Sequence, residues 1–214
     1  TPLTGDVMKF DILLVVFFVA FIARCEKQPK TILTIGDSNG AAKDGWVVQL
    51  AKLCPELSII NKSISGNTIG FDNNGQEELN TLRKIETYLQ EAEKEAEGIP
   101  IDLVLINLGT NDCKAIFKNR QSEVPQNMKK LISFIQNYSF QKKKPAITIV
   151  SPPPYGPDSI MREKYHGDDK RVQALIPQFK QITEEMGCGF INIYDELKSV
   201  YDQYSPDGVH MKAE

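Results

Sequence analysis

Short, uninterrupted runs of apolar residues alternate along the chain with longer segments whose apolar positions recur every three or four residues. The short runs are typical of strands covered on both faces, and the longer segments are typical of helices with one buried face. The apolar runs predict strands at residues 31–35, 57–60, 101–108, 146–150 and 190–193. The periodic segments predict helices at residues 46–53, 77–97, 128–138 and 171–186, the last kinked or split by Pro177.

This alternation predicts an α/β fold. We expect a doubly wound, three-layer α/β/α sandwich around a five-stranded parallel sheet with right-handed crossovers. No linker or internal repeat divides the chain after Lys30, so residues 30–214 are expected to form one domain. A closing helix is expected after His210, but the chain ends four residues later, which indicates a truncated sequence.

The N-terminal segment has a different pattern. Residues 12–23 are uncharged and apolar, and Lys9 precedes them. A helix needs about 20 such residues to span a bilayer, so this run is too short to do so. Its length and its apolar character are typical of the central part of a secretory signal. A buried strand or core helix is the alternative, but it would have to be covered on all sides. Met8 is the expected start of the protein, so residues 1–7 are expected to be extraneous. Residues 1–29 are then expected to comprise these residues plus a leader and tether.

Cys25 follows the apolar run directly. Residues 22–25 resemble a bacterial lipobox, although Arg24 stands where a small residue is usual. A lipid on Cys25 would anchor the protein to a membrane surface without spanning it. We therefore expect an exported bacterial protein, either periplasmic or a membrane-anchored lipoprotein. The spacing of the other cysteines indicates neither a zinc site nor a disulfide framework.

Composition and charge indicate which kinds of binding partner the chain is suited to. The chain is 41% hydrophobic and 25% charged, which is typical of a soluble globular domain. Its net charge of −3 gives no basic surface for nucleic acid. No glycine-rich phosphate loop is present, which argues against a nucleotide-binding domain of flavodoxin type.

Polar blocks follow the predicted strands, at residues 36–39, 65–67, 109–112 and 207–210. Ligands of such sheets bind outside the carboxyl ends of the strands, so these blocks are expected to gather at one edge. Ser38, in the first block, is a candidate nucleophile. A serine hydroxyl reacts only when a neighbouring base takes its proton.

The chain has two histidines, His166 and His210, and either could be that base. His210 is favoured because Asp207, three residues earlier, can orient its ring and fix the tautomer. Gly66 lets a backbone N–H approach a reacting oxygen closely, and Asn111 offers an amide donor. With the N–H of Ser38 they would form an oxyanion hole, and this chemistry needs no metal or cofactor.

Over residues 31–210 the chain resembles the SGNH, or GDSL-type, hydrolase family, which has a flavodoxin-like architecture. The four residues that give the family its name correspond to Ser38, Gly66, Asn111 and His210. The aspartate of the family's catalytic triad corresponds to Asp207. Two positions depart from the family pattern. Asn39 stands where leucine or isoleucine is usual, and Met211 where proline often follows the histidine.

Residues 108–115 and 150–154 look most like the arylesterase-like branch of that family. The resemblance implies hydrolysis of small carboxylic esters through an acyl-enzyme. Acetyl esters on carbohydrates suit an exported esterase, while short aryl esters, lipid esters and thioesters stay open as substrates. Some members of the branch transfer the acyl group to alcohols. Residues 152–169 would border the pocket. Its candidate walls are Asn39, Trp46, Tyr155, Tyr165 and His166.

Two rival interpretations remain to be weighed. Residues 36–40 also match the nucleophile elbow of α/β-hydrolases, but that elbow lies well inside its sheet, whereas Ser38 follows the first strand. A non-catalytic surface module that binds carbohydrate on the same scaffold is the second alternative. The pairing of Asp207 with His210 argues against it, because an idle site needs neither.

Overall fold

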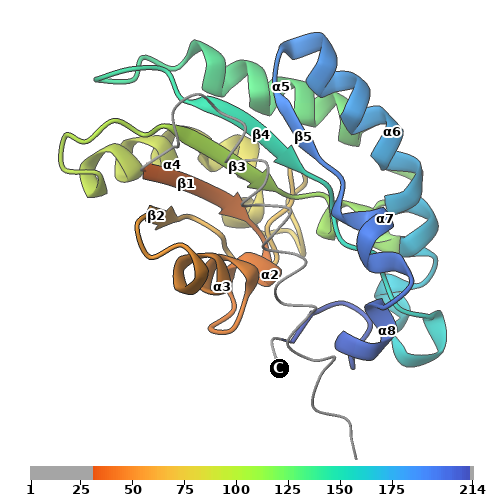
Figure 1. The fold of residues 1–214 in the computed structure, drawn as a ribbon. Helices are drawn as coiled ribbons and strands as arrows, with labels where there is room; N and C mark the ends of the chain where they lie inside the picture. Colours follow the sequence, from red (N-terminus) through yellow and green to blue (C-terminus); the bar gives the residue numbers. More distant parts are fainter. Residues whose placement is uncertain (1–30, 213–214) are drawn as a thin grey trace, which may run out of the picture.

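The computed structural model describes residues 31–212. The expected leader, its tether and Cys25 lie outside the described residues. Within the described residues, five strands form one parallel sheet in the order β2-β1-β3-β4-β5, which confirms the predicted fold class (Figure 1). The strands are β1 (Thr31–Gly36), β2 (Ser58–Asn61), β3 (Leu103–Asn107), β4 (Ala146–Val150) and β5 (Gly189–Ile191).

Side chains of each strand alternate between the two faces of the sheet, as the pleat requires. Leu33 and Ile35 of β1 pack into the larger core, while Ile32, the residue before Leu33, packs into the smaller one. The larger core lies under α4 (Thr81–Glu95), α5 (Glu123–Asn137) and α6 (Asp168–Met186). The smaller core lies under α3 (Trp46–Leu53) and α7 (Ile193–Lys198). The sheet is therefore the middle of three layers (Figure 1).

The helix expected over residues 77–97 is shorter than its apolar pattern suggests. Residues Glu77–Leu79 form a separate 3-10 turn, and α4 begins only at Thr81. Between them the backbone of Asn80 is extended, with φ −103° and ψ 105°. The amide of Asn80 donates to Asp72, and the carbonyl of Leu79 accepts from Thr68. These bonds to the preceding loop override the local preference for helix.

Two other helices differ from the prediction at their starts. Helix α5 begins at Glu123, before Pro125, because proline is tolerated in a first turn where no intrahelical N–H bond is lost. Helix α6 begins at Asp168 and runs through Pro177 to Met186 without a break. Of the two effects expected of Pro177, a kink or a split, the split was wrong. Its end is set by Gly187, whose φ is +66°.

Several short elements at the carboxyl ends of the strands were not predicted. The helices among them are α2 (Ser38–Ala41), α7 and α8 (Tyr201–Tyr204). Helix α7 begins at Ile193, the residue expected to end the fifth strand. The 3-10 turns are Asn111–Cys113, Ala115–Arg120, Asp158–Ile160 and Glu163–Tyr165. The strand arrows in Figure 1 point toward the side where α2, α7 and α8 lie. Loops that fold into short turns therefore build the edge at which a ligand would bind.

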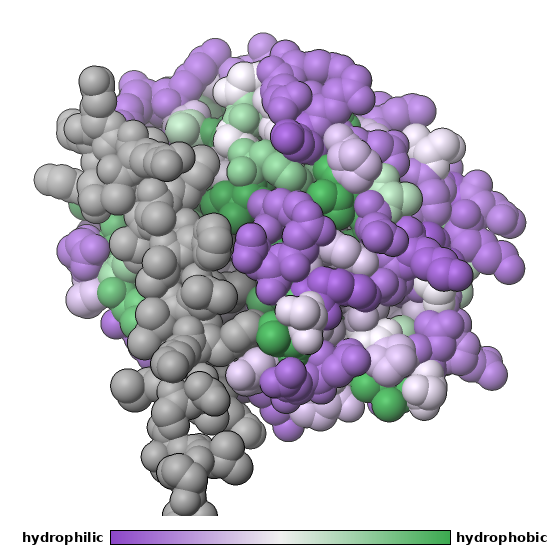
Figure 2. All heavy atoms as spheres, turned by 45° about the vertical axis from the view of Figure 1, so that its right-hand side comes forward, coloured by the Kyte–Doolittle hydropathy of each residue, from purple (hydrophilic) through white to green (hydrophobic). Residues whose placement is uncertain are grey.

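One face of the outer surface is largely hydrophilic, as expected for a chain with 25% charged residues. Figure 2 shows hydrophilic side chains over most of this face, with smaller hydrophobic areas between them. Within residues 31–212, no helix is long and apolar enough to cross a membrane. In the same range the thiols of Cys54 and Cys113 are buried and unpaired, and Cys188 is half-buried.

Candidate active site

The candidate nucleophile lies on a tight turn between β1 and α2. Ser38 is the first residue of α2, and the Asp37 carboxylate caps this helix by accepting the N–H of Asn39 at 2.9 Å. The amide of Asn61, at the end of β2, donates to the carbonyl of Gly40 at 3.0 Å. A Cβ on Gly40 would lie 2.5 Å from the hydroxyl of Ser63, so glycine is required for this close packing. The Ser38 turn is thereby fixed from both sides.

His210 lies between Ser38 and Asp207. Its Nε2 is 2.9 Å from Oγ of Ser38, and its Nδ1 is 2.7 Å from one carboxylate oxygen of Asp207. The other oxygen of Asp207 accepts the N–H groups of Val209 and His210, at 2.9 and 2.8 Å. A proton on Nδ1 leaves Nε2 free to accept the serine hydroxyl proton. This is the geometry that an activated serine needs.

Hydrogen bonds to Asp207 hold its carboxylate in the charged form. Burial by itself would raise the pKa of this carboxyl. The bonds from the His210 ring and from the N–H groups of His210 and Val209 outweigh burial, so the pKa is lowered. Asp207 is therefore ionised at neutral pH and stabilises a positive charge on the adjacent imidazole.

The segment that carries His210 is packed against the loop after β4. The hydroxyl of Tyr201 donates to the carbonyl of Val209 at 2.8 Å, and the N–H of Gly156 donates to the carbonyl of Gly208 at 2.8 Å. A Cβ on Gly208 would lie 2.6 Å from Met161, and its φ is +72°. Glycine at this position thus permits both the turn and the close contact.

The two predicted oxyanion donors are joined through the Gly66–Asn67 segment. Gly66 has a φ of +92°, a conformation that L side chains rarely adopt. The amide nitrogen of Asn111 donates to the carbonyl of Asn67 at 2.9 Å. An amide nitrogen carries two hydrogens, and this bond uses one of them. The Asn67 amide donates in turn to the carbonyl of Gly36, two residues before Ser38, at 3.3 Å.

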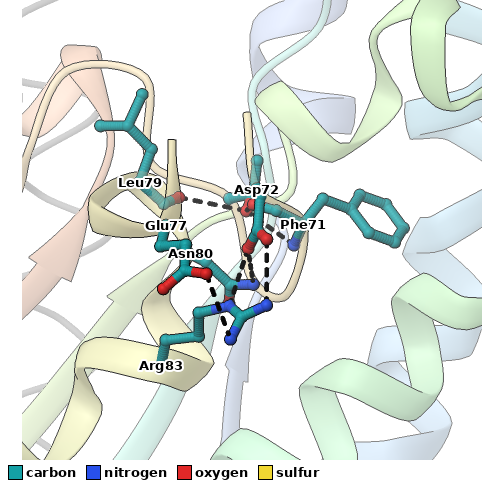
Figure 3. Close-up of polar contacts among 7 residues, drawn as sticks. Phe71, Asp72, Glu77, Leu79, Asn80 and Arg83 are labelled. Carbon is teal, nitrogen blue, oxygen red and sulfur yellow. Dashed lines mark hydrogen bonds and ion pairs between the residues drawn. The ribbon is translucent and has the colours of Figure 1, made fainter. Parts of the chain in front are cut away.

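The loop that carries Gly66 has its own polar framework, shown in Figure 3. Asp72 accepts two bonds from the guanidinium of Arg83, at 2.9 and 3.0 Å, and one from Asn80 at 2.7 Å. The bond from Arg83 is the main reason that the pKa of Asp72 is lowered. Thr68 closes the loop by bonding to the carbonyls of Phe71 and Leu79. The loop is thus tied to the first turn of α4.

Sequence reasoning missed a set of asparagines whose amides bind backbone groups of neighbouring loops. Asn107, at the end of β3, donates to the carbonyl of Ser151 at 2.8 Å. Asn73 donates to the carbonyl of Gly66 at 2.6 Å. A position at a strand end was an available signal for Asn61 and Asn107 alone, and even that position does not reveal the loop that each one bonds. The missed members of the set are Asn61, Asn67, Asn73 and Asn107.

The candidate pocket walls have different surroundings. Tyr155 is 2% exposed, and its hydroxyl donates to the carbonyl of Thr110. Tyr165 packs on the Tyr155 ring with centroids 5.9 Å apart. The ring of His166 lies 3.3 Å from the carbonyl of Met161, so the structure brings His210 and not His166 to Ser38. The remaining two candidates flank the α2 turn and are Asn39 and Trp46, each half-buried.

Within residues 31–212, no group of three or more His, Cys, Asp or Glu side chains is arranged to hold a metal ion. The arrangement around Ser38 is one of proton transfer and hydrogen-bond donation.

A family model described as GDSL-like lipase/acylhydrolase matches residues 33–214. The chain belongs to the GDSL-like lipase/acylhydrolase family.

Solved structures agree with the family in fold. A carbohydrate acetylesterase family member from Sinorhizobium meliloti is 25% identical, with a TM-score of 0.68 over 86% of this chain and 90% of that one. An aryl esterase from M. smegmatis is 24% identical, with a TM-score of 0.68 over 86% and 91% of the two chains. No curated protein sequence matches the chain.

Proposed function

We propose that this carboxylic ester hydrolase works as a serine esterase, with Ser38 as nucleophile, His210 as general base and acid, and Asp207 as the orienting carboxylate. One observation carries the proposal: a single imidazole bonds Ser38 through Nε2 and Asp207 through Nδ1. Membership of the GDSL-like lipase/acylhydrolase family supports the same chemistry. The non-catalytic alternative has no support from the family or from its solved relatives.

In the first half-reaction, Oγ of Ser38 bonds to the carbonyl carbon of the ester while its proton passes to Nε2 of His210. The carbonyl oxygen becomes an oxyanion. When the C–O bond to the alcohol breaks, the alcohol takes the proton from His210, and an acyl-enzyme remains. In the second half, water gives its proton to His210 and attacks the acyl carbon. The acid then leaves, and Ser38 regains its proton.

The oxyanion of both tetrahedral intermediates would be bound by the N–H groups of Ser38 and Gly66 and by the second amide hydrogen of Asn111. The bond from Asn111 to the carbonyl of Asn67 supports this role, because it holds the amide beside Gly66 before substrate arrives. Donors held in advance need no reorganisation as charge develops, which is why they lower a barrier effectively.

For the substrate we propose small acyl esters, acetyl groups on carbohydrates above all. The likeness to the Sinorhizobium meliloti carbohydrate acetylesterase family member supports this class. An export leader with Cys25 as a lipid anchor would place the enzyme in the periplasm or on a membrane, where such glycans occur. Cleavage and lipidation at Cys25 are testable by mass spectrometry of the mature N-terminus.

The test of the mechanism is Ser38→Ala together with a fluorophosphonate label. The wild-type enzyme is expected to hydrolyse p-nitrophenyl acetate and to take the label on Ser38, whereas Ser38→Ala should fold normally and do neither. Retained hydrolysis in Ser38→Ala would remove the proposed nucleophile. A panel of esters that varies acyl length and alcohol then tests the substrate class. A preference for long acyl chains over acetyl would contradict it.

A further inference from the structure

A buried lysine lies one side chain away from Gly66. Lys114 is 4% exposed, and its Nζ is 3.3 Å from the side-chain oxygen of Asn73. Asn73 is fully buried, and its amide nitrogen donates to the carbonyl of Gly66 at 2.6 Å. Two hydrogen bonds in series therefore join the Lys114 ammonium to the residue whose N–H is the proposed oxyanion donor.

Lys114 lies on the same short segment as two other residues that bind the Gly66 loop. Asn111 bonds the carbonyl of Asn67, and the carboxylate of Asp112 accepts the N–H of Ile69 at 2.9 and 3.0 Å. The three side chains hold the loop at successive points. Of the three, Lys114 is the residue linked to Gly66, and the link is indirect, through the side chain of Asn73.

A lysine is rarely buried unless its charge is used. The charged groups around Lys114 are the carboxylates of Asp37, Asp112 and Asp168 and the ammonium of Lys164. Burial is the main reason that the pKa of Lys114 is lowered, to about 8, so the ammonium is still charged at neutral pH.

Gly66 depends on such outside contacts for its orientation. It has no side chain, and its φ of +92° lies in a region that residues with a side chain rarely adopt. The bond from Asn73 to its carbonyl fixes the peptide plane between Gly66 and Asn67, whose N–H donates to the carbonyl of Ile64 at 3.0 Å. The N–H of Gly66 belongs to the preceding peptide plane, and holding the carbonyl limits the direction of that N–H by restricting ψ of Gly66. A donor that turns away from the oxyanion loses much of its effect, because hydrogen bonds weaken steeply with angle.

We propose that Lys114 is a positioning residue of the oxyanion hole, acting through Asn73 to keep the N–H of Gly66 aimed at the developing oxyanion. This inference rests on the proposed function. In the proposed mechanism Lys114 contacts no reacting atom. Removing its side chain should therefore slow the chemical step without weakening substrate binding. A lysine that served only to fill space or balance charge would not act through Asn73.

The experiment compares Lys114→Met, Asn73→Ala and the double variant with p-nitrophenyl acetate, measuring kcat and KM separately. Each single variant is expected to lower kcat by about 10- to 100-fold, less than loss of a whole donor, with KM within about twofold. Since both act on one contact, the double variant should be no slower than the slower single variant. Lys114→Arg, which keeps a charged donor, should recover part of the loss.

Lys118→Met is the control. Lys118 lies four residues after Lys114 on the next 3-10 turn, and its side chain is exposed. The variant removes a nearby lysine charge from a position outside the site and without a bond to Asn73, so its kcat should equal that of the wild type. Equal losses in Lys118→Met and Lys114→Met would overturn the proposal, as would a fully additive double variant.

Failure of this inference is distinguishable from failure of the proposed function. If the wild type takes the fluorophosphonate on Ser38 and Lys114→Met keeps wild-type kcat, only the positioning role is wrong. If the wild type takes no label on Ser38, the proposed nucleophile is wrong. Circular dichroism checks that each variant is folded. Should Lys114→Met not fold, unchanged kcat in a folded Asn73→Ala variant would overturn the proposal by itself.

Discussion

At the scale of single residues, the carboxylate of Asp207 shows how one side chain sets several properties of the site. It accepts two backbone N–H groups with one oxygen and the His210 ring with the other. The backbone bonds fix the carboxylate, and the fixed carboxylate determines which nitrogen of the ring carries the proton. Asp207 therefore controls the ring through geometry as much as through charge.

Replacing Asp207 with asparagine should separate these effects. The amide oxygen of Asp207→Asn can still accept the backbone N–H groups, but its NH₂ would donate to Nδ1 and favour the wrong ring tautomer. We expect kcat to fall by about 10³- to 10⁴-fold at neutral pH with little change in folding. Steady-state hydrolysis of p-nitrophenyl acetate measures this, with the exposed Asp202→Asn as control. A loss of less than about tenfold would contradict the orienting role.

Asn111→Ala tests the proposed side-chain donor to the oxyanion. The change removes the amide hydrogen offered to the oxyanion and also the bond to the carbonyl of Asn67. We expect kcat to fall by about 10²- to 10³-fold with KM nearly unchanged, because the donor acts in the transition state. The exposed Asn137→Ala is the control. If KM rose while kcat held, Asn111 would serve ground-state binding instead.

At the scale of elements, the Ser38 turn depends on the way α2 and α3 meet. Gly45, the residue before α3, has an ordinary φ of −67°, so its backbone would accept alanine. A Cβ there would lie only 2.3 Å from the carbonyl oxygen of Asn39, next to Ser38. Glycine at this position is required by packing and not by backbone conformation. Gly75 shows the opposite case, with φ +74° and open space around a Cβ.

These two glycines give a matched pair of variants. Gly45→Ala should lower the free energy of unfolding by about 1–3 kcal/mol, because backbone must move to relieve the clash. It should also lower kcat, since the displaced carbonyl belongs to Asn39, the residue after the proposed nucleophile. Gly75→Ala should cost about 1–2 kcal/mol through strain alone and leave kcat unchanged. Urea denaturation and ester hydrolysis measure both, and equal kcat in the two variants would contradict this account.

Elements with strong local patterns were predictable from the sequence. The apolar runs located all five strands, and the motif at residues 36–39 located the turn after β1. The start of α4 was not predictable, because the bond from Asn80 to Asp72 joins segments whose pairing no local pattern reveals. The asparagines that hold the loops together were missed for the same reason. Each bonds a backbone group of a loop that only the completed fold brings near.

At the scale of the whole molecule, the unusual feature is the amount of charge buried under the site. Asp37, Asp112 and Asp168 are each fully buried, and Lys114 is nearly so. Arg171 pairs with Asp168 and donates to the carbonyl of Cys113 at 2.5 Å. Removing charges from water is costly, so this cluster should make stability depend on pH in a definite direction.

Between pH 5 and 8, this cluster should make the protein less stable as the pH rises. Burial is the main reason that the pKa values of Asp112 and Asp168 are raised to about 7, from an ordinary 3.8. From about pH 4 to pH 7 the folded protein therefore binds protons that the unfolded chain has released. Stability from this source is fully present below about pH 4 and is lost as the pH rises through 7.

Urea denaturation at pH 5, 6, 7 and 8 measures this effect, which linkage limits to about 1.4 kcal/mol per pH unit for each proton. Asp112→Asn cannot titrate, yet its amide oxygen can still accept the N–H of Ile69, so its slope should be shallower than that of the wild type. The exposed Asp44→Asn should keep the wild-type slope. If Asp112→Asn and the wild type lost stability in parallel across this range, Asp112 would be charged throughout. The cluster would then hold a permanent negative charge, and Lys114 would be its necessary counter-ion.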